Sequence, residues 1–155
     1  MFGQGVSRMK ISTKGRYALR MLVDLASRDR SEYVALKDIA ADQEISKKYL
    51  EQIVPLLTRG GILSTNRGYQ GGYRLSRDPS SITCGEILRL TEGSLAPIAC
   101  LDNGIENNYC ERKADCMTLP VWVGLTRLIN DYLDGITLQD IIDQHQTLGG
   151  DDYVI

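Results

Sequence analysis

Residues 36–61 read LKDIAADQEISKKYLEQIVPLLTRGG, the pattern of two helices joined by a short polar turn. Apolar residues recur at helical spacing over residues 36–41 and again over 47–59. Ser46 is a suitable N-cap for the second helix, which Gly60 and Gly61 end. Polar side chains open that helix and are expected to face outward: Lys47, Lys48, Tyr49, Glu51 and Gln52. This arrangement predicts a helix-turn-helix with its recognition helix. Pro55 is expected to bend the last turns or to end the helix early.

A glycine-rich hairpin is expected directly after the second helix. Two short strand candidates, residues 62–67 and 73–76, flank the run Gly68-Tyr69-Gln70-Gly71-Gly72. Glycines such as Gly71 and Gly72 let a hairpin tip approach a partner's backbone closely. Arg67, Arg74 and Arg77 supply positive charge for phosphates or for a narrow minor groove. We interpret the hairpin as the wing of a winged helix.

The rest of the chain extends this unit on both sides. A core-facing helix begins at Ser12 or Thr13, so residues 9–80 form the predicted DNA-binding domain, after a flexible tail at 1–8. Residues 81–145 contain a short helix opened by the capping box Thr83-x-x-Glu86, a cysteine loop, a long helix and a last short helix over 137–144. Residues 146–155 are expected to be a tail. The fold class is mainly α with a small β-hairpin: a winged helix-turn-helix plus a long C-terminal dimerisation helix.

The long helix carries a broad apolar face that includes Trp122, Leu125, Ile129 and Tyr132. Such a face is more than one small domain is expected to cover, and we assign it to a two-fold dimer interface. Ordinary core packing within one subunit is the alternative.

Composition and charge agree with a soluble DNA-binding protein. The 155 residues are 43% hydrophobic and 25% charged, as in an ordinary globular domain. No apolar run approaches the length of about 20 residues that a membrane span needs, and we expect a cytoplasmic protein with no membrane partner. The net charge of −2 hides a division, because residues 1–77 carry +7 and residues 78–155 carry −9. The basic half is the part suited to nucleic acid.

Three cysteines lie close together in the polar loop after the DNA-binding half. Cys100, Cys110 and Cys116 are separated by nine and then five residues. That spacing is too wide for the paired cysteines of zinc ribbons, but three such thiols can converge on an iron-sulfur cluster. Cys84 stands apart and is interpreted as a packing residue.

These motifs resemble the family of bacterial winged-helix regulators that includes IscR, NsrR and CymR. The resemblance runs from Met9 to about Gln144 and is carried by residues 9–20, 45–52 and 67–73. It implies a homodimer with a long crossing helix, recognition helices in successive major grooves and wings in the minor groove of a two-fold operator. By position, Arg67 corresponds to the family's wing arginine, and five residues correspond to its recognition-helix residues: Ser46, Lys48, Tyr49, Glu51 and Gln52.

Some members of this family hold an iron-sulfur cluster on three loop cysteines, and Cys100, Cys110 and Cys116 place this chain with them. The fourth ligand of the family is not present, because Leu119 and Arg16 occupy the positions of the histidine or the acidic residue that supplies it. Possible substitutes are Asp102, Glu111 and Asp115 in the loop, a carboxylate from the partner subunit, or an outside thiol or water. His145 is interpreted as a surface side chain. We therefore expect a labile [2Fe-2S] or [4Fe-4S] cluster.

The principal hypothesis is a homodimeric transcription regulator, a repressor, whose operator binding depends on this cluster. A second keeps the DNA-binding role but makes the loop a thiol switch or zinc site, or makes the protein act through a partner enzyme of cysteine metabolism. A third is a metal or redox enzyme on a winged-helix scaffold. The sequence shows no conventional catalytic constellation, and we expect no enzyme.

Overall fold

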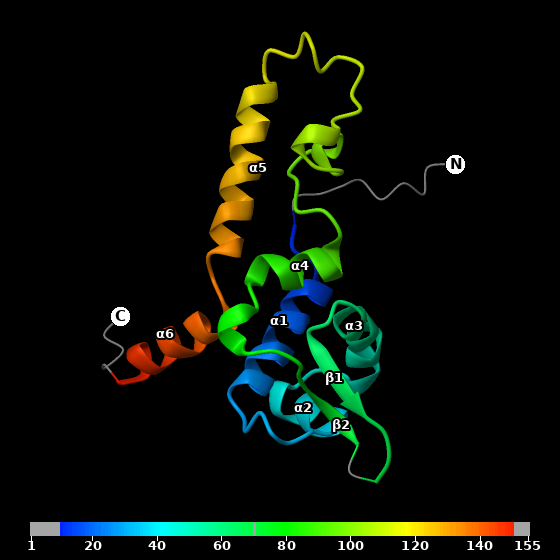
Figure 1. The fold of residues 1–155 in the computed structure, drawn as a ribbon, viewed down its shortest axis with the longest axis vertical. Coiled ribbons are helices and arrows are strands. Elements are labelled where there is room, and N and C mark those ends of the chain that lie inside the picture. Colours follow the sequence, from blue (N-terminus) through cyan, green and yellow to red (C-terminus); the bar gives the residue numbers. More distant parts are fainter. Residues whose placement is uncertain (1–9, 70, 151–155) are drawn as a thin grey trace.

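A hairpin and a long arm project in opposite directions from a helical body (Figure 1). The computed structural model describes residues 10–69 and 71–150, so the tail expected at 1–8 lies outside the described residues. Helices α1 to α4 form the body, and the arm consists of α5 and the loop that precedes it. The elements in chain order are α1 (Thr13–Ala26), α2 (Leu36–Gln43), α3 (Lys47–Arg59), β1 (Leu63–Asn66), β2 (Gly72–Leu75), α4 (Cys84–Glu92), α5 (Leu119–Asp134) and α6 (Leu138–Gly150). The predicted fold class is confirmed.

The hydrophobic core lies around α1, which packs against α2, α3, α4 and α6. Its apolar face is buried as the spacing predicts, with Ala18, Met21 and Leu22 fully inaccessible. The facing helices contribute further fully buried side chains: Ile39, Leu50, Ile53, Leu57 and Ile87. Each such aliphatic side chain contributes about 1.5–3 kcal/mol when it leaves water, so this core holds the body together.

The start of α1 is tied to the end of α4. The Ser12 hydroxyl caps α1 by accepting the Gly15 backbone N–H at 3.3 Å. In turn, the Ser12 backbone N–H and hydroxyl donate to the Glu92 carboxylate at 2.8 and 2.6 Å. Ser12, in the first stretch that resembles the regulator family, is therefore held against the helix that leads to the cysteine loop.

Helices α2 and α3 form the predicted helix-turn-helix. Helix α2 runs two residues beyond its predicted end at Ala41, and Glu44 ends it in the left-handed conformation with φ of 53°. The Ser46 hydroxyl caps α3 by accepting the Tyr49 N–H at 3.4 Å. The early end expected at Pro55 does not occur, since α3 continues to Arg59. Pro55 is exposed, and the backbone hydrogen bond that it cannot donate to the Glu51 carbonyl does not end the helix.

The predicted wing is an antiparallel hairpin, in which β1 pairs with β2 from Leu63↔Leu75 to Asn66↔Gly72. A third segment joins its inner edge, because Val34 and Tyr73 exchange two backbone hydrogen bonds of 2.9 Å. Gly72 is required for this approach: a Cβ atom there would lie 2.3 Å from the Val34 carbonyl oxygen. The body thus holds the base of the wing while its tip extends beyond it.

Helix α4 contacts the arm, and one of its arginines binds α5. Thr83 caps α4 by accepting the Glu86 N–H at 3.1 Å, as predicted, but the Glu86 carboxylate accepts from Arg77 and does not complete the predicted capping box. The Arg89 guanidinium donates to both carboxylate oxygens of Asp134 in α5 at 2.8 Å and to the Asn130 amide oxygen at 2.8 Å. Gly85 makes room for this contact, since a Cβ atom there would lie 2.0 Å from Asp134 Oδ1.

Helix α6 is longer than predicted. The capping box forms as expected, with Asp140 N–H donating to Thr137 Oγ1 at 3.0 Å and Thr137 N–H donating to Asp140 Oδ2 at 2.9 Å. The helix then passes the predicted end at Gln144 and reaches Gly150, so the first five residues of the expected tail are helical. No glycine or proline interrupts the sequence before Gly149, which explains the extra turns. Within the described residues, no helix is both long and apolar enough to cross a membrane.

Candidate nucleic-acid interface and cysteine loop

The exposed face of α3 carries most of the predicted recognition residues. Ser46, Lys47, Lys48, Glu51 and Gln52 are all exposed, and Lys47 lies 3.7 Å from the Glu51 carboxylate. Tyr49 differs from the prediction that it faces outward. Its ring is half-buried and packs edge-on against Tyr17 of α1, with ring centroids 5.3 Å apart. Four polar or charged side chains of α3 are therefore free to meet a ligand, whereas Tyr49 mainly anchors the helix to the body.

The predicted wing residues also include one that is exposed and one that binds the body. Arg67 follows the last paired residue of β1 and is exposed. Arg74 instead turns back to the body, donating to the Ser31 carbonyl at 3.0 Å and lying 4.3 Å above the Tyr33 ring. Gly71 and Gly72 have structural reasons for lacking a side chain, because a Cβ atom at Gly71 would lie 2.6 Å from the Asn66 carbonyl oxygen. Of this group, Arg67 is the residue best placed to reach a partner.

A groove of about 820 Å³ separates α3 from the wing. Four basic residues lie along it, of which Lys47 and Arg67 were predicted from the sequence. Lys37, in the first turn of α2, and Arg59, in the last turn of α3, were not predicted. Each stands alone in its local sequence, so only their approach in the folded chain identifies them. The groove brings basic side chains of α2, α3 and the wing together.

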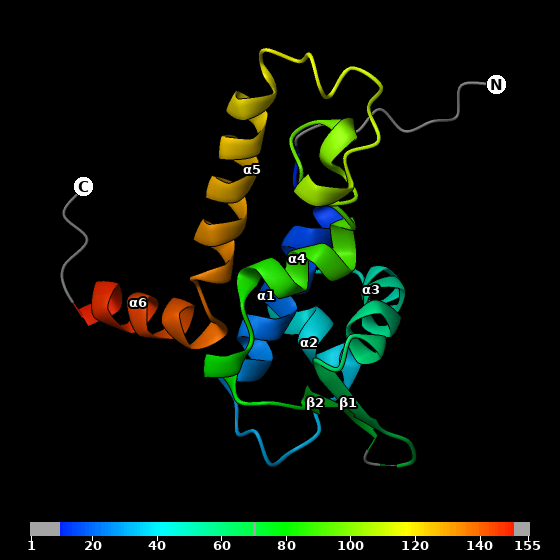
Figure 2. The same cartoon turned by 45° about the horizontal axis from the view of Figure 1, so that its top comes forward.

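The cysteine loop lies at the opposite end of the molecule from the wing tip, as two views show (Figures 1 and 2). Cys100, Cys110 and Cys116 are half-buried free thiols. The loop is organised by buried Asn108, whose side-chain oxygen accepts the Cys110 N–H at 2.9 Å and whose carbonyl accepts Lys113 Nζ at 3.1 Å. Among the residues that the structure describes, no three Cys, His, Asp or Glu side chains lie close enough to share one metal ion.

Cys116 has the most distinctive environment of the three loop cysteines. Its sulfur lies 3.5 Å from the Thr118 hydroxyl, at the start of α5. The hydrogen bond from Thr118 lowers the pKa of the Cys116 thiol, helped by the backbone N–H groups of Thr118 and Leu119 and by the charge of Arg112. Cys84 is the opposite case, because burial raises the pKa of its thiol, and it packs in the body at the start of α4.

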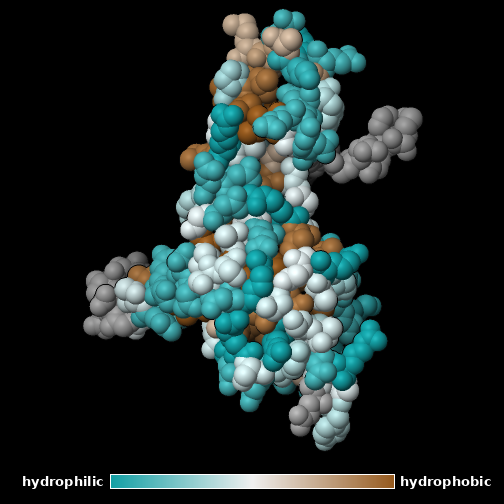
Figure 3. Space-filling model, in the orientation of Figure 1, coloured by the Kyte–Doolittle hydropathy of each residue, from teal (hydrophilic) through white to brown (hydrophobic). Residues whose placement is uncertain are grey.

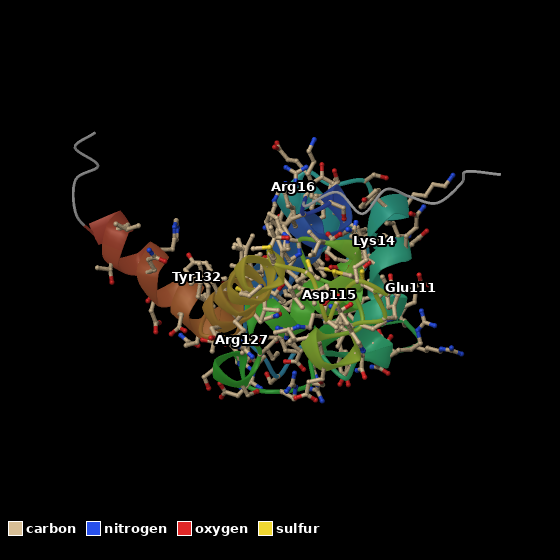
Figure 4. The ribbon with its side chains drawn as sticks, turned by 90° about the horizontal axis from the view of Figure 1, so that it is seen from above. Lys14, Arg16, Glu111, Asp115, Arg127 and Tyr132 are labelled. Atoms are coloured by element: carbon tan, nitrogen blue, oxygen red, sulfur yellow. The ribbon has the colours of Figure 1, made fainter. Side chains whose placement is uncertain are left out.

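The three loop carboxylates predicted as possible fourth ligands differ in burial. Glu111 and Asp115 are exposed on the loop, and Figure 4 shows them on a different element from Arg16, which extends from α1. Asp102 is partly buried, and its Oδ1 atom has no hydrogen-bond partner among the described residues. His145 is exposed on α6 and lies beside α1.

The apolar face predicted for α5 is partly buried within the chain and partly exposed. Trp122, Leu125 and Ile129 are half-buried within the same chain. Tyr132 is 67% exposed and belongs to a stripe with Val121 and Leu128, which are 61% and 66% exposed. The difference in exposure follows from how α5 is turned about its own axis. Asn130 and Asp134 lie on the side of α5 that meets α4, where Arg89 donates to both of them. Apolar surface is visible along this arm in Figure 3.

A helix-turn-helix, a wing and a basic surface that joins them define a winged-helix protein of the DNA-binding class. The model of the Rrf2 family, described as an iron-dependent transcriptional regulator, matches residues 11–144. The chain belongs to the Rrf2 family of transcriptional regulators, and the predicted resemblance is confirmed.

Relatives and solved structures agree with this assignment. The chain is 35% identical to the regulator CymR of Bacillus subtilis strain 168 over 133 residues, which cover 86% of this chain and 89% of that protein. It is 34% identical to the regulator IscR of Vibrio parahaemolyticus over 140 residues, 90% of this chain and 81% of that protein. The structure of CymR, the global cysteine regulator of B. subtilis, matches with a TM-score of 0.69 at 34% identity, covering 87% of this chain and 97% of that one. T. potens IscR matches with a TM-score of 0.68 at 36% identity, covering 88% of each chain.

Proposed function

We propose that this Rrf2 regulator is a homodimeric repressor that binds a two-fold operator, and that the cysteine loop sets its affinity through an iron-sulfur cluster. One observation carries the proposal. The exposed face of α3 and the wing lie at one end of the molecule, and the three free thiols of the cysteine loop lie at the other end. Helix α5 follows the cysteine loop and is bound by Arg89 of α4, and α4 in turn packs against α3.

DNA recognition is assigned to the exposed part of α3 and to Arg67. Gln52 has an amide that pairs with base edges in the major groove, and Lys47 and Lys48 suit phosphates. Arg67 extends from a narrow hairpin, the shape that enters a minor groove. The half-buried Tyr49 positions the helix through Tyr17.

The homodimer is assigned to the stripe of Val121, Leu128 and Tyr132 on α5. Large apolar side chains at positions spaced by seven and four residues are typical of helix pairs, and a contact about a two-fold axis buries the same stripe of each copy. The symmetry of such a dimer would present two copies of α3 to two half-sites of an operator.

The loop fits an iron-sulfur cluster in its donor chemistry but not in its present arrangement. Thiolates are the usual ligands of such clusters, and Cys100, Cys110 and Cys116 would hold it. Asp102 is the best placed of the loop carboxylates to complete the set, because it has a buried oxygen without a partner. The loop must close to gather these groups. When bound, a cluster would supply electron exchange and sensitivity to oxidants.

Anaerobic purification tests this proposal. We expect coloured protein that contains iron and sulfide, loses its colour in air and changes its affinity for operator DNA at the same rate. The variants Cys100→Ser, Cys110→Ser and Cys116→Ser should lose iron, whereas Cys84→Ala, away from the loop, should retain it. Colourless protein after reconstitution with iron and sulfide would reject the cluster.

A second candidate keeps the DNA-binding dimer but makes the loop a thiol switch, a zinc site or a contact for an enzyme of cysteine metabolism. The open arrangement of the three thiols and the lowered pKa of Cys116 favour the thiol switch. Solved relatives include Staphylococcus aureus CymR in an oxidized form, at 35% identity. Mass spectrometry of intact protein separates the cases: loss of two hydrogens on oxidation indicates a disulfide, and a retained zinc ion indicates a metal site.

A further inference from the structure

A cavity lies where the arm joins the body, between the end of α4, the cysteine loop and α5. Its volume is about 470 Å³, within the range of roughly 300–1,000 Å³ that small-molecule sites occupy. Thr126 and Asn130 of α5 line it, together with side chains from two 3₁₀ turns of the loop, Ala99–Leu101 and Ile105–Asn107. The described lining contains no cysteine, so this cavity is distinct from the three loop thiols.

The uncompensated charge of this cavity is negative. Asp102 and Glu106 line it, and neither has an ion-pair partner among the residues that the structure describes. Arg89 also lines it, but its guanidinium is already bound to both carboxylate oxygens of Asp134 at 2.8 Å. The Asp102 Oδ1 atom is buried and accepts no hydrogen bond within the described part of the chain. A buried carboxylate oxygen without a donor is costly, and a cationic donor removes that cost.

The other lining groups favour an ammonium on a short carbon chain. Asn107 donates its amide N–H to the Asn103 carbonyl at 3.0 Å, which leaves its side-chain oxygen as an acceptor. A primary ammonium has three N–H donors, and Asp102, Glu106 and Asn107 offer oxygens to them. The lining also contains apolar side chains that suit methylene groups: Leu95, Leu101 and Ile105.

We propose that this cavity binds a small aliphatic primary amine in its ammonium form, with the Asp102 carboxylate as its main partner. The ammonium accounts for the buried oxygen that lacks a donor, and the carbon chain accounts for the apolar part of the lining. Because the walls come from α4, the loop and α5, the bound amine ties the first half of the cysteine loop to the two helices beside it.

Asp102 connects this site with the cysteine loop, and this regulatory step rests on the proposed function. There, Asp102 completes the ligand set of the cluster, and Cys100 precedes it by two residues. A carboxylate that binds an ammonium in the cavity is not available to iron. The amine therefore competes with cluster assembly.

Isothermal titration calorimetry of the full chain, free of cluster and at constant ionic strength, tests the site. The ligand is n-pentylamine at neutral pH, where the amine is protonated, and pentan-1-ol is the neutral control of similar size. The variants are Asp102→Asn and Glu106→Gln. Glu32→Gln, in the exposed loop between α1 and α2, is the control with the same change in charge. Thermal unfolding checks that each variant is folded.

We expect pentylamine to bind more tightly than pentan-1-ol. Asp102→Asn should weaken amine binding roughly 10-fold or more, because a charged hydrogen bond at a buried oxygen is lost. Glu106→Gln should weaken it less, since Glu106 is exposed, and Glu32→Gln should match wild type. Equal affinity for amine and alcohol in wild type would overturn the inference without any variant. So would equal amine affinity of wild type and folded Asp102→Asn.

A lysine side chain carries the same ammonium and chain as a free amine, and one further ligand distinguishes these sources. Nα-acetyl-lysine N-methylamide presents that chain on peptide groups. Tighter binding of this compound than of pentylamine would assign the cavity to a lysine of a partner, and weaker binding would assign it to a free amine.

Anaerobic reconstitution with iron and sulfide tests the regulatory step. Saturating pentylamine should slow the incorporation of iron, measured by absorption, and pentan-1-ol should not. Equal rates with and without bound amine would reject the competition for Asp102. If no cluster forms under either condition, the cluster of the proposed function fails, whereas the calorimetric result for the amine stands by itself.

Discussion

The contact between α4 and α5 leads to a prediction about Gly85→Ala. Whether this substitution stabilises or destabilises the protein should depend on Asp134. In Gly85→Ala, the new methyl group would lie 2.0 Å from Asp134 Oδ1 and 3.1 Å from Arg89 Nη1. Asp134 must swing away, and its paired hydrogen bonds with Arg89 are then lost. In Asp134→Ala the obstacle is absent, so the same methyl group should be accepted.

The size of the effect follows from two opposing contributions. The side chains of Arg89 and Asp134 are 39% and 45% exposed, so solvent screens their attraction and the two-point contact should contribute about 1 kcal/mol at most. Alanine favours a helix over glycine by about 0.5–1 kcal/mol in mid-helix, and by less in a first turn such as this one. Gly85→Ala should therefore be neutral or mildly destabilising in wild type and stabilising by roughly 0.5 kcal/mol in Asp134→Ala.

Urea unfolding of the four proteins in this cycle, at one fixed protein concentration, measures the coupling directly. Gly149→Ala on α6, where a methyl group would meet nothing within 4 Å, is the control and should have the same effect with or without Asp134. An equal stabilisation by Gly85→Ala in both backgrounds would show that the α4–α5 contact does not depend on this glycine.

Three further predictions follow from individual side chains. Alkylation by iodoacetamide should reach half its maximal rate at a lower pH for Cys116 than for Cys84, because the pKa of the first thiol is lowered and that of the second is raised; equal or reversed midpoints in mass mapping of the modified peptides would contradict these two shifts. Tyr49→Ala should destabilise the protein by about 1–3 kcal/mol through loss of the Tyr17 contact, whereas Tyr49→Phe should change stability little; equal losses in thermal unfolding would assign the effect to the hydroxyl instead. The pKa of Asp78 is lowered by the hydroxyl and the N–H of Ser80, so its contribution to stability is present above the ordinary Asp pKa and is lost as pH falls through the folded value; the difference in urea midpoint between wild type and Asp78→Asn should vanish in acid, and a constant difference would contradict this.

The elements that could be predicted from the sequence are those with local causes. Ser46 caps α3 and Thr83 caps α4 because a hydroxyl needs only a backbone N–H three residues away. Apolar spacing likewise identified the buried face of α1. The end of α6 was less predictable, since exposed polar residues after Gln144 can continue a helix as easily as leave it.

The roles that could not be predicted depend on residues distant in sequence. Gly72 is explained by Val34 and Tyr49 by Tyr17, contacts that no local pattern contains. The long helix showed an apolar face, but the greater exposure of Leu128 than of Ile129 depends on how α5 packs against α4, where Arg89 donates to Asn130. Lys37 and Arg59 approach one groove only after α2, α3 and the wing have packed together.

The remoteness of the cysteine loop from the wing has an evolutionary consequence. The cysteine loop contributes no side chain to the core cluster around α1. Residues can therefore be inserted or exchanged in the loop with little effect on the stability of the fold. The nine residues between Cys100 and Cys110 lie in this loop, and Leu119, at a position where the family resemblance implies a ligand, directly follows it. Under the proposed function, a change in this loop would alter what the regulator responds to and would leave the proposed DNA-binding surface of α3 and the wing unchanged.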